Sequence, residues 1–105
     1  MQTYTKKYLK ALGYDETDFI KCEICEGKAT EIHHIMTRKK FRELMNDPRN
    51  LMAICRECHQ AYGDRKYLMA ALLKIHKRVL QIADYKTDYN WFNFYLKKYE
   101  TARQD

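Results

Sequence analysis

The sequence predicts a small α+β domain, in which two short strands and a helix form a core that is flanked by further helices. Three observations predict this fold. Two Cys-x-x-Cys pairs, Cys22–Cys25 and Cys55–Cys58, stand far apart in the chain. Two short runs are rich in β-branched and apolar residues: 30–35 lies between the two cysteine pairs, and 51–55 ends at the first cysteine of the second pair. The C-terminal third of the chain carries apolar residues at helical spacing.

The size and composition indicate one folded domain, residues 1–105. A hydrophobic content of 46% with 13% aromatic residues is typical of a globular protein. No apolar stretch approaches the roughly 20 residues that a membrane span needs, and the N-terminus lacks the apolar segment of a signal peptide. We therefore expect a cytoplasmic protein with no membrane partner. The net charge of +6 is compatible with a nucleic-acid partner, although many basic proteins bind none.

The N-terminal helix is expected over residues 3–12, where Tyr4, Tyr8 and Leu12 recur at helical spacing and Gly13 supplies the stop.

A core then covers about residues 20–64. Its strands are expected at 30–35 and 51–55, and a helix is expected to open at 56–62. Between the strands, Asp47-Pro48 predicts a turn and residues 38–45 predict one or two helical turns.

A helical extension is expected over about residues 65–103, as two helices at 65–82 and 87–103. The first helix carries one apolar stripe, formed by Leu68, Leu72, Ile75, Val79 and Ile82. Its apolar face is widened by Met69, Leu73 and Leu80. The second helix carries Phe92 and an aromatic row of Trp91, Tyr95 and Tyr99. Such a wide apolar face must be covered, either by the last helix or by a homodimer or protein partner.

The four cysteines, Cys22, Cys25, Cys55 and Cys58, predict a structural zinc site. In a reducing cytoplasm they are not expected to form disulfides. One Cys-x-x-Cys turn brings two sulfur atoms together, and two such turns complete a tetrahedron around zinc. A redox pair or free buried thiols are the alternatives, which two pairs in one small chain disfavour. A site closed by four thiolates leaves no position for substrate, so this zinc is expected to support folding.

Three of the four histidines predict a second, open metal site. His33 and His34 are neighbours on a strand, so their side chains should point to opposite sides. His59 follows Cys58 on a helix, which turns it about 100° away from the zinc. One strand histidine and His59 are then free to bind a metal, while the other strand histidine takes a proton. Such a site suits phosphodiester hydrolysis. The alternative is a buried structural or ordinary surface histidine, which is the interpretation we favour for His76.

The stretch from Cys22 to His59 resembles an HNH endonuclease of the ββα-metal superfamily. The resemblance rests on the first Cys-x-x-Cys, the segment EIHHI, Asn50-Leu51 and the final CxxCH. It implies that His33 and His59 bind a catalytic divalent metal and that His34 is the general base. It also implies that Asn50 fixes the loop so that the base points correctly.

The chain also departs from colicin-type relatives, which carry a further histidine four residues after the last one. Gly63 stands at that position, so two protein ligands are expected. Nitrogen ligands tolerate Mn²⁺, Co²⁺, Ni²⁺ or Zn²⁺, and Mg²⁺ is not excluded. The loop between the strands is expected to contact DNA phosphates through Arg38, Lys39, Lys40 and Arg42, with Arg56 and Arg65 as further candidates.

The resemblance therefore predicts a metal-dependent endonuclease that hydrolyses DNA, in the cytoplasm of a bacterium or a phage-infected cell. The alternative is a zinc-stabilised module that binds nucleic acid or protein without catalysis.

Overall fold

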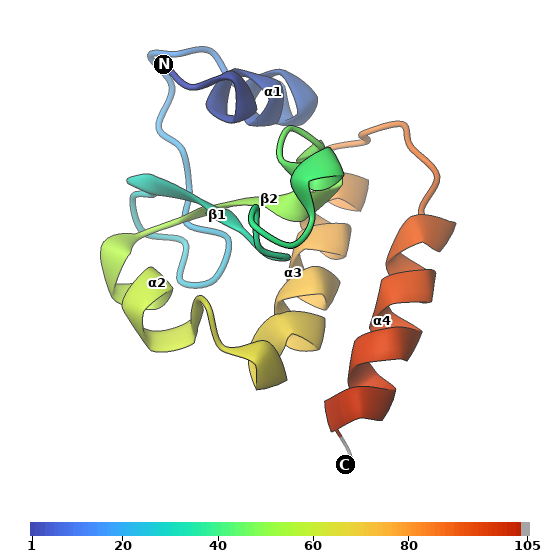
Figure 1. The fold of residues 1–105 in the computed structure, drawn as a ribbon. Coiled ribbons are helices and arrows are strands. Elements are labelled where there is room, and N and C mark those ends of the chain that lie inside the picture. Colours follow the sequence, from blue (N-terminus) through green and yellow to red (C-terminus); the bar gives the residue numbers. More distant parts are fainter. Residues whose placement is uncertain (104–105) are drawn as a thin grey trace.

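The computed structural model describes residues 1–103 and the side chains of residues 1–100. Residues 104–105 of the predicted domain lie outside the described residues. The elements are α1 (Thr3–Leu12), β1 (Glu31–His34), η1 (Arg42–Leu44), η2 (Pro48–Asn50), β2 (Leu51–Ile54), α2 (Arg56–Tyr62), η3 (Lys66–Leu68), α3 (Met69–Ile82) and α4 (Asn90–Arg103), where η marks a 3₁₀ helix. Figure 1 shows the hairpin in the centre, α1 along one side of it, and α3 and α4 next to each other. The predicted α+β class is confirmed.

The hairpin separates the two strand histidines, as predicted. β1 and β2 pair antiparallel, with His33 opposite Met52 and His34 opposite Leu51. Leu51 packs with α1, whereas Met52 packs with α3 and α4. Because neighbouring residues of a strand face opposite sides, His33 lies on the α3 side of the sheet and His34 on the α1 side. His34 contacts the ring of Tyr4 on α1, with ring centroids 4.7 Å apart.

The helices of the extension begin later than predicted. The segment predicted as one helix from residue 65 starts with the 3₁₀ turn η3, and α3 begins only at Met69. α4 begins at Asn90 instead of residue 87, because the Asp88 carboxylate accepts a hydrogen bond from the Asn90 amide at 3.0 Å and caps the helix there.

The buried face of α3 also differs from the predicted stripe. It consists of Ala70, Leu72, Leu73, His76 and Leu80. Ile82 is 74% exposed, so its assignment to the stripe was wrong. The aromatic row of α4 packs against this face, which is therefore covered within the chain. A homodimer or protein partner on the outer side of these helices stays a prediction.

A buried carboxylate connects four parts of the fold. The Glu23 side chain, 2% exposed, accepts a hydrogen bond from the Tyr8 hydroxyl at 2.5 Å and lies 2.8 Å from His76 Nδ1. His76 Nε2 donates to the Pro48 carbonyl at 2.6 Å. α1, the first cysteine pair, η2 and α3 thus meet at Glu23. The structural interpretation of His76 agrees with this burial.

Among the described helices, none is long and apolar enough to span a membrane.

Candidate active site

The four cysteines come together as the spacing predicted. Their sulfur atoms all lie within 4.8 Å of one another, and the Sγ atoms of Cys25 and Cys55 are 3.7 Å apart. A tetrahedron with zinc–sulfur bonds of about 2.3 Å has edges of about 3.8 Å, so the spacing fits. Backbone amides of Gly27 and Cys58 point at these sulfurs at 3.4 Å. The donor set and its geometry are compatible with a metal site closed by cysteines.

A second group of potential ligands lies at the other side of α2. His33, His59 and Asp64 each offer a ligand atom within 4.8 Å of the others. The ring centroids of His33 and His59 are 4.8 Å apart, and His59 Nε2 lies 3.7 Å from the Asp64 carboxylate. Burial, followed by the nearby His59, lowers the pKa of His33 to about 4, so its imidazole is neutral and free to bind a metal. Two imidazoles and one carboxylate are compatible with an open divalent metal site.

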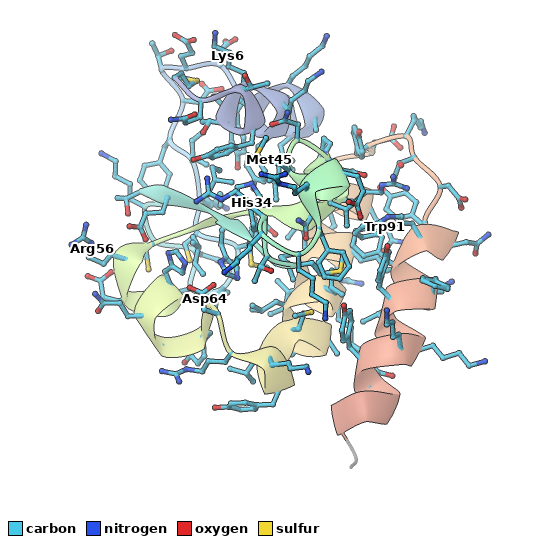
Figure 2. The ribbon with its side chains drawn as sticks, viewed as in Figure 1. Lys6, His34, Met45, Arg56, Asp64 and Trp91 are labelled. Atoms are coloured by element: carbon cyan, nitrogen blue, oxygen red, sulfur yellow. The ribbon has the colours of Figure 1, made fainter. Side chains whose placement is uncertain are left out.

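His34 carries its proton in a defined place. Its Nε2 lies 3.0 Å from the Met45 carbonyl, which can only accept, so Nε2 bears the hydrogen and Nδ1 keeps a lone pair. Figure 2 shows the two residues next to each other. Burial lowers the pKa of His34, and the hydrogen bond to Met45 acts in the opposite direction. His34 is therefore a neutral imidazole whose Nδ1 can accept a proton.

Asn50 holds the loop that carries Met45. The Asn50 side chain is fully buried. Its Oδ1 accepts from the Met36 amide at 2.7 Å, and its Nδ2 donates to the carbonyls of Met36 and Leu44 at 2.9 and 3.4 Å. The amide thus fastens both ends of the segment between residues 36 and 45.

These groups meet in one cleft of about 310 Å³, the histidine cleft, which is lined by His33, His34, His59 and Asp64 together with Ile32, Thr37, Arg38 and Lys39. The lining thus combines three potential metal ligands, a neutral imidazole and two cations. Residues 22–65 match the HNH endonuclease family. The predicted resemblance is confirmed over this HNH segment, and it indicates a nuclease or a nucleic-acid-binding role. No curated protein and no solved structure matches the chain significantly.

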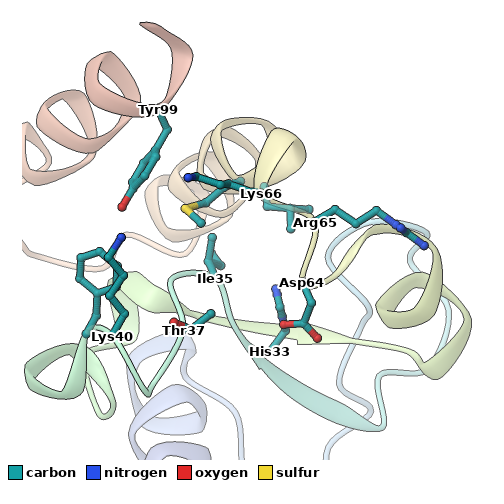
Figure 3. Close-up of a pocket in the computed structure, with 11 residues that line it drawn as sticks. His33, Ile35, Thr37, Lys40, Asp64, Arg65, Lys66 and Tyr99 are labelled. Carbon is teal, nitrogen blue, oxygen red and sulfur yellow. The ribbon is translucent and has the colours of Figure 1, made fainter. Parts of the chain in front are cut away.

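Asp64, the last but one residue of the HNH segment, was missed by the sequence analysis. We expected two protein ligands because Gly63 replaces the further histidine of colicin-type relatives. A Cβ atom on Gly63 would lie 2.3 Å from the His59 ring, so this backbone excludes any side chain there. Asp64 turns back toward β1 with a left-handed φ of 58°, which aspartate tolerates. Figure 3 shows its carboxylate beside His33. The available signal was a carboxylate soon after CxxCH.

Glu31 of the HNH segment was missed as well. Its Oε1 lies 2.8 Å from Nδ1 of His59. This contact leaves Nε2 of His59 facing Asp64. A carboxylate on the far nitrogen orients a metal-binding histidine and raises its basicity. The available signal was that Glu31 precedes His33 by two residues and so shares its face of the strand.

Replacing Glu31 by glutamine is expected to weaken metal binding at the open site by about 10- to 100-fold. The substitution removes the negative charge that orients His59 but keeps the size of the side chain. Titration of Mn²⁺ by isothermal calorimetry measures the effect, with Glu16→Gln in an exposed turn as the control. Equal affinities for Glu31→Gln and wild type would show that Glu31 does not support this site.

The predicted DNA contacts are distributed unevenly around the HNH segment. Arg38 and Lys39 line the histidine cleft, and Lys40 lines a neighbouring pocket. Arg42 is exposed on η1. Arg65 instead donates to the carbonyls of Gln60 and Ala61 at 3.2 and 2.8 Å, so its guanidinium closes the C-terminal end of α2.

Proposed function

We propose that this protein is a metal-dependent endonuclease that hydrolyses phosphodiester bonds of DNA. One observation carries the proposal: a neutral histidine with a free Nδ1 lines the same cleft as three potential ligands of a divalent metal. The match of the HNH segment supports the same reaction class. The net charge of +6 and the cations of the cleft suit a polyanionic substrate.

His33, His59 and Asp64 would hold the divalent metal. When bound, it would neutralise charge that develops on the phosphate and on the leaving oxygen. Two imidazole nitrogens with one carboxylate suit Mn²⁺, Co²⁺, Ni²⁺ or Zn²⁺, and a single carboxylate also admits Mg²⁺.

His34 acts as the general base. Its Nδ1 takes the proton of the attacking water, and its Nε2–H stays bonded to the Met45 carbonyl, which stabilises the imidazolium that forms. Asn50 is a positioning residue, because it fastens the loop on which Met45 lies. Arg38 and Lys39 line the cleft and bind phosphates there, and Lys40 and Arg42 contact phosphates further along the strand.

The cysteine site has a different role in this proposal. Cys22, Cys25, Cys55 and Cys58 hold a structural zinc, since four thiolates leave no position for water or substrate. A zinc held by these cysteines would join the segment before β1 to the start of α2. It would thereby keep His33 and His59 at the distance that the open site needs.

A plasmid-nicking assay tests the proposed function. Purified protein is incubated with supercoiled DNA in the presence of Mg²⁺, Mn²⁺, Co²⁺ or Ni²⁺, and in EDTA. We expect nicked or linear product with at least one metal and none in EDTA. A protein that binds DNA but cuts neither DNA nor RNA with any of these metals would be a non-catalytic module, and the proposal would be wrong.

Replacing Asp64 by alanine is expected to raise the metal concentration for half-maximal cleavage by roughly tenfold or more, because one of three ligands is lost. Asp84→Ala is a matched control, since Asp84 is also exposed and has a nearly identical φ of 59° far from the site. Cleavage rates measured across a Mn²⁺ titration give the comparison. An Asp64→Ala curve that superimposes on the wild-type curve would remove Asp64 from the ligand set.

A further inference from the structure

A second hollow of about 220 Å³ adjoins the histidine cleft, and we call it the side pocket. It lies where the loop after β1 meets the start of α3 and the end of α4 (Figure 3). The side pocket and the cleft share three lining residues, His33, Thr37 and Asp64. Whatever occupies the side pocket therefore also reaches two of the three metal-binding side chains.

The walls of the side pocket are largely apolar and aromatic. Ile35 and Leu72 are buried beneath it, and Met69 and the rings of Phe41 and Tyr99 line it. Flat aromatic and apolar surfaces of this kind bind nucleobases by stacking, with little preference for one base.

Three cationic residues line the side pocket, Lys40, Arg65 and Lys66, and the Arg65 guanidinium donates to the carbonyls of Gln60 and Ala61. Figure 3 shows the amines of Lys40 and Lys66 directed toward Tyr99. The Lys40 amine also lies 5.9 Å from the centre of the Phe41 ring. An apolar hollow with ammonium groups at its edge complements a nucleotide, whose base is flat and apolar and whose phosphate is an anion.

We propose that the side pocket binds the base of a nucleotide that flanks the cut phosphodiester, and that the protein therefore favours DNA in which this nucleotide is unpaired. A base within a duplex is stacked on both sides, so it must leave the helix to enter a hollow. That step costs least where the nucleotide is already unpaired. This inference rests on the proposed nuclease function.

The side pocket is a feature of this chain and not of the HNH segment alone. Met69, Leu72 and Tyr99 lie outside residues 22–65. The C-terminal extension thus supplies one wall of the side pocket and also packs against the hydrophobic core around Met52. Substrate preference is in this way assigned to α3 and α4, and bond cleavage to the HNH segment.

Nucleotide binding tests the side pocket without any cleavage. The probes are 2′-deoxyadenosine 5′-monophosphate and 2-deoxyribose 5-phosphate, which differ only by the base, titrated into the full-length protein with Mn²⁺ by calorimetry. We expect the nucleotide to bind about tenfold more tightly than the sugar phosphate. Met69→Trp, which fills the side pocket, should abolish the difference, as should Tyr99→Ala. Tyr67→Trp is the control, because Tyr67 is 61% exposed on η3 and does not line the side pocket. Equal binding of the two probes by the wild-type protein would overturn the inference.

Cleavage provides the second measurement. Two duplexes of the same sequence are compared, one fully paired and one with a single unpaired nucleotide. We expect kcat/KM to be about tenfold higher for the second duplex, with the cut next to the unpaired nucleotide. Met69→Trp should bring the ratio to near one, and Tyr67→Trp should preserve it.

The two measurements separate the inference from the function on which it rests. A protein that cuts both duplexes equally and binds both probes equally is a nuclease without a base site. A protein that binds the nucleotide more tightly but cuts no DNA retains the base site and contradicts the nuclease function.

Discussion

Replacing His34 by alanine is expected to lower the rate of DNA cleavage by about 10²- to 10⁴-fold, the contribution of a general base. The substitution removes the neutral imidazole whose Nδ1 we propose as the proton acceptor, while His33, His59 and Asp64 keep their places in the cleft. The rate of nicking of supercoiled plasmid at saturating Mn²⁺ measures the loss.

His34→Gln is a sharper variant, because a glutamine amide can still donate to the Met45 carbonyl but cannot take a proton. We expect it to be as inactive as His34→Ala. Metal analysis and circular dichroism should show unchanged zinc content and helicity in both variants. Cleavage within about threefold of wild type by either variant would exclude His34 as the base, given the size of general-base effects.

Removal of the metal from the cysteine site is expected to unfold the HNH segment. Binding of zinc to four thiolates contributes roughly 10 kcal/mol or more to folding, which exceeds or equals the stability of a typical small domain. Cys22, Cys55 and Cys58 are buried next to Ile54, so loss of the metal also exposes this cluster. Circular dichroism and thermal melting before and after a strong chelator measure the effect.

Two controls distinguish this metal from the one proposed for the histidine cleft. A weak chelator should stop cleavage and leave the spectrum unchanged, and added Mn²⁺ should restore cleavage. Cys58→Ser should lose zinc and melt at a much lower temperature. A zinc-free Cys58→Ser protein with the wild-type melting temperature would contradict the structural role of the cysteine site.

Elements with a local sequence signal were predicted closely. α1 ends where Gly13 takes a left-handed φ of 75°, and α2 spans the predicted residues 56–62. The strands are one or two residues shorter than predicted, because only 31–34 and 51–54 pair. The starts of α3 and α4 were missed, since a 3₁₀ turn and a side-chain cap at Asp88 decide them.

The buried face of α3 could not be predicted from periodicity alone. Several apolar positions surround this helix, so the choice among them depends on what packs there. Met52 from the hairpin and Phe92 from α4 meet Leu72, Leu73 and Leu80 in one cluster. The sequence contains these partners but does not show which side of the helix they occupy.

The same limit applies to the candidate site. The positions of His33, His34 and His59 follow from strand alternation and from the CxxCH turn, so the sequence predicts their arrangement. Asp64 joins them only because the chain reverses after Gly63, and Glu31 only because its strand lies beside α2. The positions of Asp64 and Glu31 both depend on how separate elements pack, and residue spacing alone does not predict that packing.

The contacts of Glu23 determine how the HNH segment can be engineered. Glu23 lies within residues 22–65, yet Tyr8 and His76, whose side chains contact its carboxylate, lie outside them. Removing one partner of a buried charge costs about 3–5 kcal/mol. The HNH segment is consequently not expected to fold stably when it is moved alone into another protein. A chimeric nuclease built from it has to include α1 and α3, and its fusion points belong before residue 3 or after α4.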